Sequence, residues 1–264
     1  MTRFLRGLTL AAMATTMISS AVAALAPPVE FSLLLSDQEC VDVLPLDGML
    51  YGALSTGGVA VWDDDDPSTF TRWTTLDGLT SNRINDLHWT GDHLWVATQG
   101  GGLTRVTLDE TGPLFRQYTG LGDVSALNVA VVTGRVVDGS ERVFYGLVNG
   151  GVGIINDGFA GNIFSAASFD GLVSDMIHDL AFVEDDLWIA TADGISVYSE
   201  GIFLARSTGL GSRYVTALLA DSGGGLTAST TDGVYRWSST GMTWERLGAS
   251  TDPVADLVEF EGQT

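Results

Sequence analysis

Residues 77–106 read DGLTSNRINDLHWTGDHLWVATQGGGLTRV. Apolar and polar residues alternate from Leu94 to Thr98, a glycine-rich turn follows at residues 99–102, and a second alternating run ends at Val106. Two alternating runs joined by a short glycine turn indicate a β-hairpin. The same hairpin recurs along the chain, beginning at Leu50, Leu94, Val143, Leu187 and Leu226.

Each hairpin belongs to a longer repeat. A short aromatic-marked run follows it, as at Phe70 to Trp73, and a turn then leads to a further alternating run, as at Ile84 to Leu87. Four short strands in a repeat of about 40 to 45 residues are typical of a propeller blade. The sequence therefore predicts an all-β fold, a β-propeller of four-stranded antiparallel blades. We expect the five blades near residues 41–76, 84–119, 125–169, 177–207 and 215–248.

The two ends of the chain predict an incomplete ring. Residues 254–264 repeat the inner strand of a blade, so we expect a partial sixth blade there. Residues 31–35 have the pattern of an outer strand and would be the N-terminal closing strand, because propellers commonly close with strands from both termini. We therefore interpret the chain as a piece of a longer reading frame. A complete product that closes with a defective blade is the alternative.

The first 23 residues resemble a secretory signal peptide. Arg3 and Arg6 precede an apolar stretch, and Ala21 to Ala23 offer a small-x-small cleavage site. We expect cleavage, which leaves residues 24–264 as the propeller; an uncleaved membrane anchor is the alternative. The expected location is periplasmic or secreted, in a bacterium. Cys40 is the single cysteine, so an internal disulfide is excluded.

The composition limits the partners. Twelve basic residues stand against 33 acidic ones, a net charge of −21. Such a surface repels polyanions, so nucleic acid and anionic membrane surfaces are excluded as partners. We also expect no membrane insertion after signal cleavage.

The repeat resembles the two-component regulator propeller repeat. Residues 77–106 and 170–198 share its pattern of Gly-Leu, an alternating strand, Leu-Trp and a glycine turn. The resemblance covers nearly the whole chain after residue 23. It implies propellers of six to eight blades, often working as sugar-sensing ectodomains of hybrid histidine kinases. The repeat is architectural, so the resemblance is specific for the fold and weak for function.

Carboxylates recur at one register of the repeat. Asp42, Asp86 and Asp179 each lie eight residues before the hairpin leucine or its equivalent, and Asp256 matches them by its context. Ala126 and Ala217 take the matching place in the other two units. If these positions face the central channel, they form a ligand site for a cation or polyol. If they accept hydrogen bonds from backbone amides between blades, they are structural.

Three further sets of residues are candidates. Arg83 and Arg213 lie in similar loops and could pair with the carboxylates. The run Asp63, Asp64, Asp65 and Asp66 has oxygen ligands suited to calcium, although most acidic runs are simply solvated. His88, His93 and His178 could share a metal site, and surface or strand-filling histidines are the alternative. No other cofactor is expected.

No catalytic motif is present in the sequence. We therefore expect an exported, non-catalytic binding or interaction propeller that recognises a glycan, a peptide or a partner protein through its blade loops. Two alternatives stay open. The chain is then either a sensor ectodomain fragment of a hybrid two-component histidine kinase, or a propeller lyase or hydrolase that acts on polysaccharide.

Overall fold

The computed structural model describes residues 4–6, 39–63, 66, 70–120 and 127–257. These residues form β-strands, turns and loops and contain no α-helix. The strands make five antiparallel sheets. In chain order the sheets comprise β2 (Cys40–Leu46), β3 (Met49–Leu54), β4 (Gly58–Asp63) and β5 (Phe70–Trp73); β6 (Ile84–Trp89), β7 (Leu94–Thr98), β8 (Gly102–Asp109) and β9 (Gly112–Tyr118); β10 (Val129–Val137), β11 (Ser140–Leu147), β12 (Val152–Asn156) and β13 (Phe159–Phe164); β14 (Ile177–Val183), β15 (Asp186–Thr191), β16 (Gly194–Ser199) and β17 (Ile202–Ala205); and β18 (Val215–Ala220), β19 (Leu226–Thr230), β20 (Gly233–Ser238) and β21 (Thr243–Leu247).

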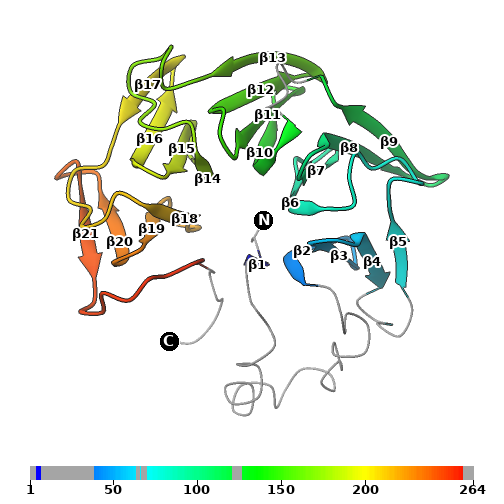
Figure 1. The fold of residues 1–264 in the computed structure, drawn as a ribbon, viewed down its shortest axis with the longest axis horizontal. Helices are drawn as coiled ribbons and strands as arrows, with labels where there is room; N and C mark the ends of the chain where they lie inside the picture. Colours follow the sequence, from blue (N-terminus) through cyan, green and yellow to red (C-terminus); the bar gives the residue numbers. More distant parts are fainter. Residues whose placement is uncertain (1–3, 7–38, 64–65, 67–69, 121–126, 258–264) are drawn as a thin grey trace.

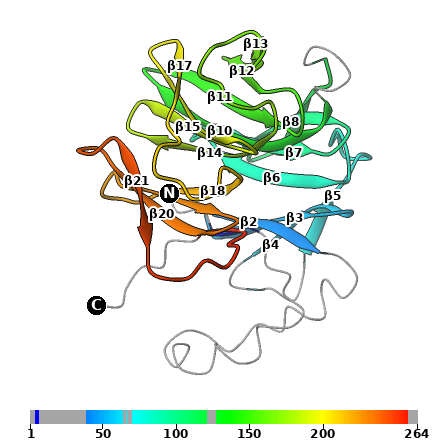
Figure 2. The ribbon, with the colours of Figure 1, turned by 60° about the vertical axis from the view of Figure 1, so that its left-hand side comes forward.

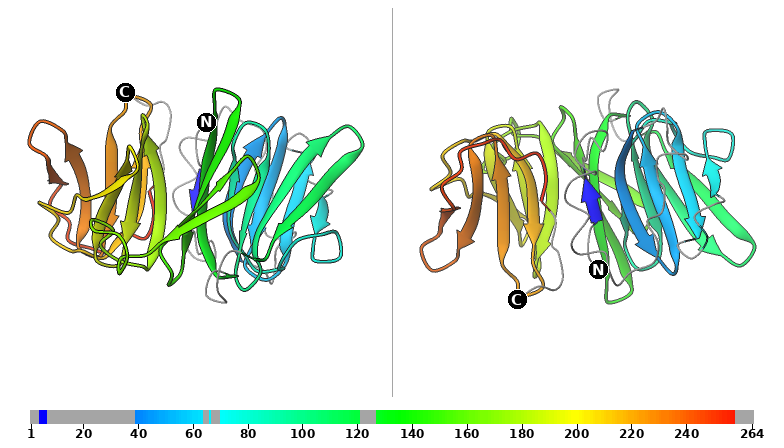
Figure 3. Two further views of the ribbon diagram at one scale, coloured as in Figure 1. Left: turned by 90° about the horizontal axis from the view of Figure 1, so that it is seen from above. Right: turned by 90° about the horizontal axis from the view of Figure 1, so that it is seen from below.

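The sheets are the blades of a propeller. They follow one another around an axis as an open arc, with the first strand of each sheet nearest the axis (Figure 1). Turned views show that neighbouring sheets pack face to face and that the loops gather at two ends of the strands (Figures 2 and 3). The predicted all-β propeller of four-stranded antiparallel blades is confirmed. Below, the blades are numbered one to five in chain order.

The first sheet has one additional strand. β1 (Phe4–Arg6) pairs antiparallel with β2, on the side of β2 away from β3. It is the only part of the expected signal segment that the structure describes. The expected closing strand at residues 31–35 lies outside the described residues, as do residues 258–264 of the expected sixth blade. Residues 254–257 are described and form no strand.

Four apolar cores lie between consecutive blades. Each core takes buried side chains from both sheets that face it. In four blades an aromatic residue directly follows the first leucine or valine of the hairpin and is buried in one of these cores. These residues are Tyr51, Trp95, Phe144 and Trp188. Burying one such ring contributes about 2 to 3 kcal/mol relative to exposure, so the packed faces hold the blades together without a disulfide.

Each inner strand has a β-bulge at its second residue. The pairing register shifts there in all five blades, at Val41, Asn85, Ala130, His178 and Thr216. A bulge increases the local twist and turns the side chain of the additional residue away from the sheet. The repeated bulge therefore turns one side chain of each inner strand toward the next blade.

Within the part of the chain that the structure describes, no helix is long and apolar enough to cross a bilayer.

Candidate binding rim at the connector end

The recurrent carboxylates Asp42, Asp86 and Asp179, here called the axial carboxylates, bind the backbone of the next blade. Asp86 is 1% exposed, and its Oδ2 accepts a hydrogen bond of 2.7 Å from the amide of Val132 in the third blade. Asp42 accepts in the same way from Leu87, and Asp179 from Leu218, at 2.9 and 2.8 Å. Each accepting carboxylate thus joins one blade to the following one.

Three of the five bulge residues, each one position before the carboxylate or its equivalent, make a second hydrogen bond to the segment that follows their blade. Asn85 donates from Nδ2 to the carbonyl of Val129 at 2.7 Å. The Nδ1 of His178 donates to the carbonyl of Val215 at 2.6 Å, because a carbonyl can only accept. Thr216 donates to the carbonyl of Val254 at 2.5 Å, which places Val254 at the register of Val129 and Val215.

Two blades lack the carboxylate. Ala217 takes its place in the fifth blade, as expected from the sequence. In the third blade the place belongs to Val131 and not to Ala126, because the register after the bulge pairs Val131 with Gly146 as it pairs Asp86 with Ala97. The first hairpin of the third blade is longer than the others, so Val131 lies further from its hairpin residue, Val143, than the carboxylates lie from theirs.

Asp256 lies after Val254 in the last described segment. Its Oδ1 accepts a hydrogen bond of 2.7 Å from the amide of Leu257. Asp42 and Asp179 bind the amide of their own following residue in the same way. Residues 254–257 thus repeat the polar pattern of an inner strand without strand pairing.

A second polar cluster joins blades two and three. Glu141, 6% exposed, accepts hydrogen bonds at Oε1 from Thr90, Trp95 and His93, at 2.6, 2.9 and 3.1 Å. His88 binds the carbonyl of Gly134 at 2.7 Å. With His178, all three histidines therefore contact the following blade, each at a different place. Among the described residues, no three His, Cys, Asp or Glu side chains form a group that could hold a metal ion.

The acidic run begins at the end of a strand. Asp63 is the last residue of β4 and is exposed, as is Asp66. Asp64 and Asp65 lie outside the described residues. The predicted calcium site therefore stays a prediction.

The loops at the two ends of the propeller differ in what determines their exposed residues. The turn end carries the turns between first and second strands and between third and fourth strands. Asp47, Asp138, Asp157, Glu184 and Glu200 lie in these turns with φ of 48 to 51°. Short polar side chains tolerate this left-handed conformation, so turn geometry explains many of the acids at this end.

The connector end carries the segments between blades and the turns between second and third strands. The residue directly before each inner strand has the same backbone bond in every blade: its carbonyl accepts from the turn between the second and third strands, at 2.9 to 3.3 Å. We call these five residues the rim, because the inner strands surround the axis (Figure 1). The rim residues are Glu39, Arg83, Asn128, Met176 and Tyr214, and all are exposed.

The rim holds different side chains on one repeated backbone. In three blades a serine two residues earlier accepts the amide hydrogen bond of the rim residue, at 3.1 to 3.2 Å, and fixes the turn. The side chains nevertheless comprise an acid, a base, an amide, a thioether and an aromatic ring. A rigid backbone that presents varied exposed side chains is the usual arrangement of a binding surface.

The two predicted arginines lie at the connector end but not at equivalent positions. Arg83 is a rim residue, whereas Arg213 precedes the rim residue of its blade. Arg213 pairs with Asp193 at 3.1 Å, and both side chains are 61% exposed. Asp193, the partner of Arg213 in this pair, is not among the carboxylates that the sequence offered as its partners.

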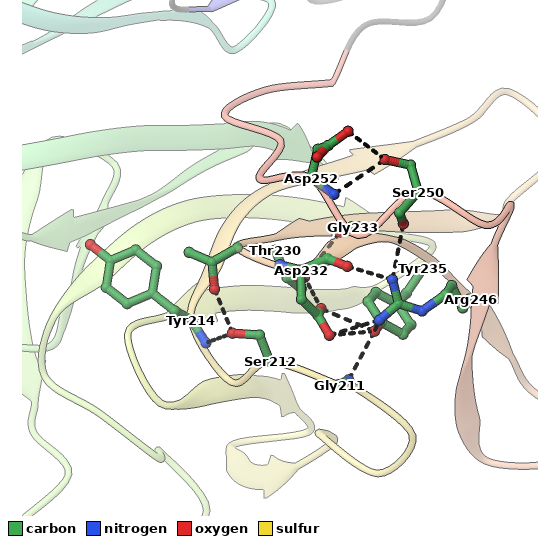
Figure 4. Close-up of polar contacts among 11 residues, drawn as sticks. Gly211, Ser212, Tyr214, Thr230, Asp232, Gly233, Tyr235, Arg246, Ser250 and Asp252 are labelled. Atoms are coloured by element: carbon green, nitrogen blue, oxygen red, sulfur yellow. Dashed lines mark hydrogen bonds and ion pairs between the residues drawn. The ribbon is translucent and has the colours of Figure 1, made fainter.

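A hydrogen-bonded clasp fixes the connector after the fifth blade. Arg246 donates to Asp232 Oδ2 at 2.7 Å and to the carbonyl of Ser250 at 3.0 Å, and Tyr235 donates to Asp232 at 3.0 Å (Figure 4). Burial raises the pKa of Asp232, but hydrogen bonds and the Arg246 charge lower it by more, below its usual 3.8. Tyr214 points away from this clasp (Figure 4).

Sequence reasoning found Arg83 and missed the other rim residues. The available signal was the serine two residues before the rim position, as in Ser81, Ser174 and Ser212. Glu39 and Asn128 lack that signal, and only the repeated carbonyl contact identifies them.

The fold and its repeated inner-strand links define a β-propeller of four-stranded blades. Among solved structures, the chain is similar to the extracellular domain of the putative hybrid two component system BT3049 from B. thetaiotaomicron, with a TM-score of 0.62 and 17% identity over 77% of this chain. The corresponding domain of BT4673 from the same organism matches with a TM-score of 0.59 and 16% identity over 81% of this chain. At these low identities the structural similarity shows the fold alone, and it is the fold that the repeat resemblance predicted.

This chain covers 29% of each of those two chains. An ancestral GH74 enzyme also matches, with a TM-score of 0.61 and 12% identity over 80% of this chain and 32% of the enzyme. No protein-family model matches the sequence, and no curated protein matches it.

Proposed function

We propose that this chain is an exported, non-catalytic binding propeller that recognises a glycan, a peptide or a partner protein through the rim at its connector end. The carrying observation is that five equivalent, exposed positions on one repeated backbone contact differ in chemistry. Scaffold positions of the repeat would be expected to share a residue type, whereas contact positions would be expected to vary.

Export is part of this proposal. Cleavage after residue 23 would remove β1, and β2 would then be the edge strand nearest the axis, as the inner strands of the other four sheets are. The mature N-terminus, measured by mass spectrometry on protein recovered from the periplasm or medium, tests this step. An N-terminus at Met1 would contradict it.

The test of binding uses arrays of glycans and of peptides. The triple variant Arg83→Ser, Met176→Ser and Tyr214→Ser removes three rim side chains. The matched control changes one arginine and two exposed apolar residues on outer strands, as Arg72→Ser, Ile202→Ser and Leu247→Ser. We expect array binding by the wild type and the control, and loss of binding in the rim variant. Equal binding by the rim variant would place the site elsewhere.

A sensor ectodomain is the second candidate, because the neighbours BT3049 and BT4673 are described as extracellular domains of putative hybrid two component systems. A sensor ectodomain would bind its ligand through the same rim, but it would be joined to a membrane helix and a kinase. Reading the source gene beyond residue 264 tests it. A membrane helix followed by kinase segments would support a sensor, and a stop codon would contradict it.

A polysaccharide lyase or hydrolase is the third candidate function. It needs an acid and a base that face one substrate position. Asp42, Asp86 and Asp179 instead accept backbone hydrogen bonds between blades. Turnover of a polysaccharide by the wild type, lost in the rim variant, would favour the enzyme over the binding module.

A further inference from the structure

We infer that the blade-four and blade-five half of the rim is an anchor site for an apolar side chain on a protein segment that carries basic residues beside that side chain. This inference rests on the proposed binding function and selects one of its ligand classes. It concerns Met176 and Tyr214 and the residues that hold them.

Three exposed side chains on this half are apolar. Met176 is 38% exposed and Tyr214 is 44% exposed at adjacent rim positions. Phe169 precedes Met176 in the same connector and is also 38% exposed, with its ring 4.9 Å from that of Phe164. Aromatic residues and methionine are enriched in protein interfaces, where Lys and Glu are depleted. These three side chains are therefore of the types that protein contacts favour.

The polar groups around Tyr214 already bind one another. Ser212 Oγ lies 2.6 Å from Thr231 Oγ1 and also accepts from the Tyr214 amide at 3.2 Å. Arg213 pairs with Asp193 on the same loops. A sugar ring would bring several hydroxyl groups that need new partners on losing water, and each unmet one costs free energy. An apolar side chain has no such requirement, which favours it here.

The Tyr214 ring is held in place before any ligand arrives. His178 from blade four packs against it with ring centroids 4.6 Å apart. His178 is itself fixed by its 2.6 Å hydrogen bond to the carbonyl of Val215, and the carbonyl of Tyr214 accepts from Thr231 at 3.3 Å. A preordered aromatic ring loses little conformational entropy on binding, so it suits the role of an anchor.

Charge selects the flanking residues of the partner. The chain carries −21, and the exposed pair of Asp193 and Arg213 beside the anchor adds no net charge, so the overall charge sets the field there. The field of such a protein attracts cationic segments and repels anionic ones, and salt screens this attraction. An apolar side chain therefore complements the apolar side chains of the anchor site, and Lys or Arg beside it complements the overall charge of the chain.

The experiment uses three acetylated and amidated pentapeptides: Lys-Gly-Phe-Gly-Lys, Glu-Gly-Phe-Gly-Glu and Lys-Gly-Ser-Gly-Lys. Saturation-transfer NMR reports which peptide protons contact the full chain. We expect saturation of the phenylalanine ring of the basic peptide and a weaker effect with the acidic peptide. The serine peptide should show none. The effect should fall as salt is raised.

Variants locate the contact. Tyr214→Ser should weaken binding of the basic phenylalanine peptide about tenfold, the usual effect of losing an aromatic anchor. Tyr214→Phe keeps the ring and should retain binding, which separates ring contact from hydroxyl hydrogen bonding and shows that the rim still folds. Ile202→Ser, on the exposed outer strand β17, is the matched control and should bind as the wild type does.

Three results would overturn the inference: equal binding of the serine and phenylalanine basic peptides, tighter binding of the acidic peptide, or unchanged binding by Tyr214→Ser. If array glycans bind at the rim while the pentapeptides do not, this inference fails and the proposed function stands. If neither glycans nor peptides bind the wild type, both fail.

Discussion

Replacing Asp86 by alanine tests the structural role of the axial carboxylates. Asp86 is 1% exposed and accepts the Val132 amide of the next blade at 2.7 Å. Removing a charged acceptor loses about 1.5 to 3 kcal/mol of hydrogen bonding, and the donor left behind is also buried. Loss of a carboxylate from the interior returns part of its desolvation cost. We therefore expect a net destabilisation of about 2 kcal/mol, or about 4 to 8 °C in Tm for a domain of this size.

The assay is urea unfolding followed by tryptophan fluorescence, with the slope compared between variants. Asp185→Ala is the matched control: Asp185 is a carboxylate that accepts from Arg135 at 2.9 Å, but its side chain is 96% exposed. An exposed pair contributes about 0 to 1 kcal/mol. Asp86→Asn keeps an acceptor oxygen and should fall between the two. If Asp86→Ala unfolds at the same urea concentration as Asp185→Ala, the blade-linking role of the carboxylate is refuted.

Three further perturbations follow from the packing. Trp188→Ala removes a 6% exposed ring packed 5.0 Å from Trp237, and should cost about 3 to 5 kcal/mol in urea unfolding; a cost below that of an exposed substitution would contradict the core assignment. Tyr145→Phe should leave stability unchanged or raise it by about 1 kcal/mol, because the buried Tyr145 hydroxyl has no hydrogen-bond partner among the described contacts, and burial raises its pKa to about 12. The lowered pKa of Asp232 stabilises the fold above pH 3.8, and this contribution is lost as pH falls through the lower folded value. Below pH 3.8, the urea midpoint should therefore fall less steeply with decreasing pH in Asp232→Asn than in the wild type. Identical pH dependence of the two midpoints would show that Asp232 does not contribute to the acid destabilisation.

The blades could be predicted from the sequence because each is a local pattern. Alternation with period two assigns strands, and glycine turns fix the hairpins, so the predicted hairpin at Leu94 is the observed pair β7 and β8. The buried aromatics Trp95 and Trp188 follow from the same register. These features depend on contacts within a few residues along the chain.

The axial register shows where local reasoning stops. The sequence found the recurrent Asp42, Asp86 and Asp179 and offered two roles for them. The choice depends on whether the carboxylate reaches the next blade, and the amide of Val132 lies 46 residues from Asp86. The sequence also assigned Ala126 to the place that Val131 takes, because the longer first hairpin of the third blade breaks the constant spacing from the hairpin residue.

The sequence alone therefore determined the class of fold and the five four-stranded repeats. The tertiary structure decided how blades are joined and which residues share the rim. Met176 and Tyr214 are 38 residues apart and come from different repeats, with no shared chemistry. Their common position exists only because both blades make the same backbone hydrogen bond, in which the carbonyl before the inner strand accepts from the turn between the second and third strands. Any residue type can supply that carbonyl, so the contact fixes no side chain that the sequence could show.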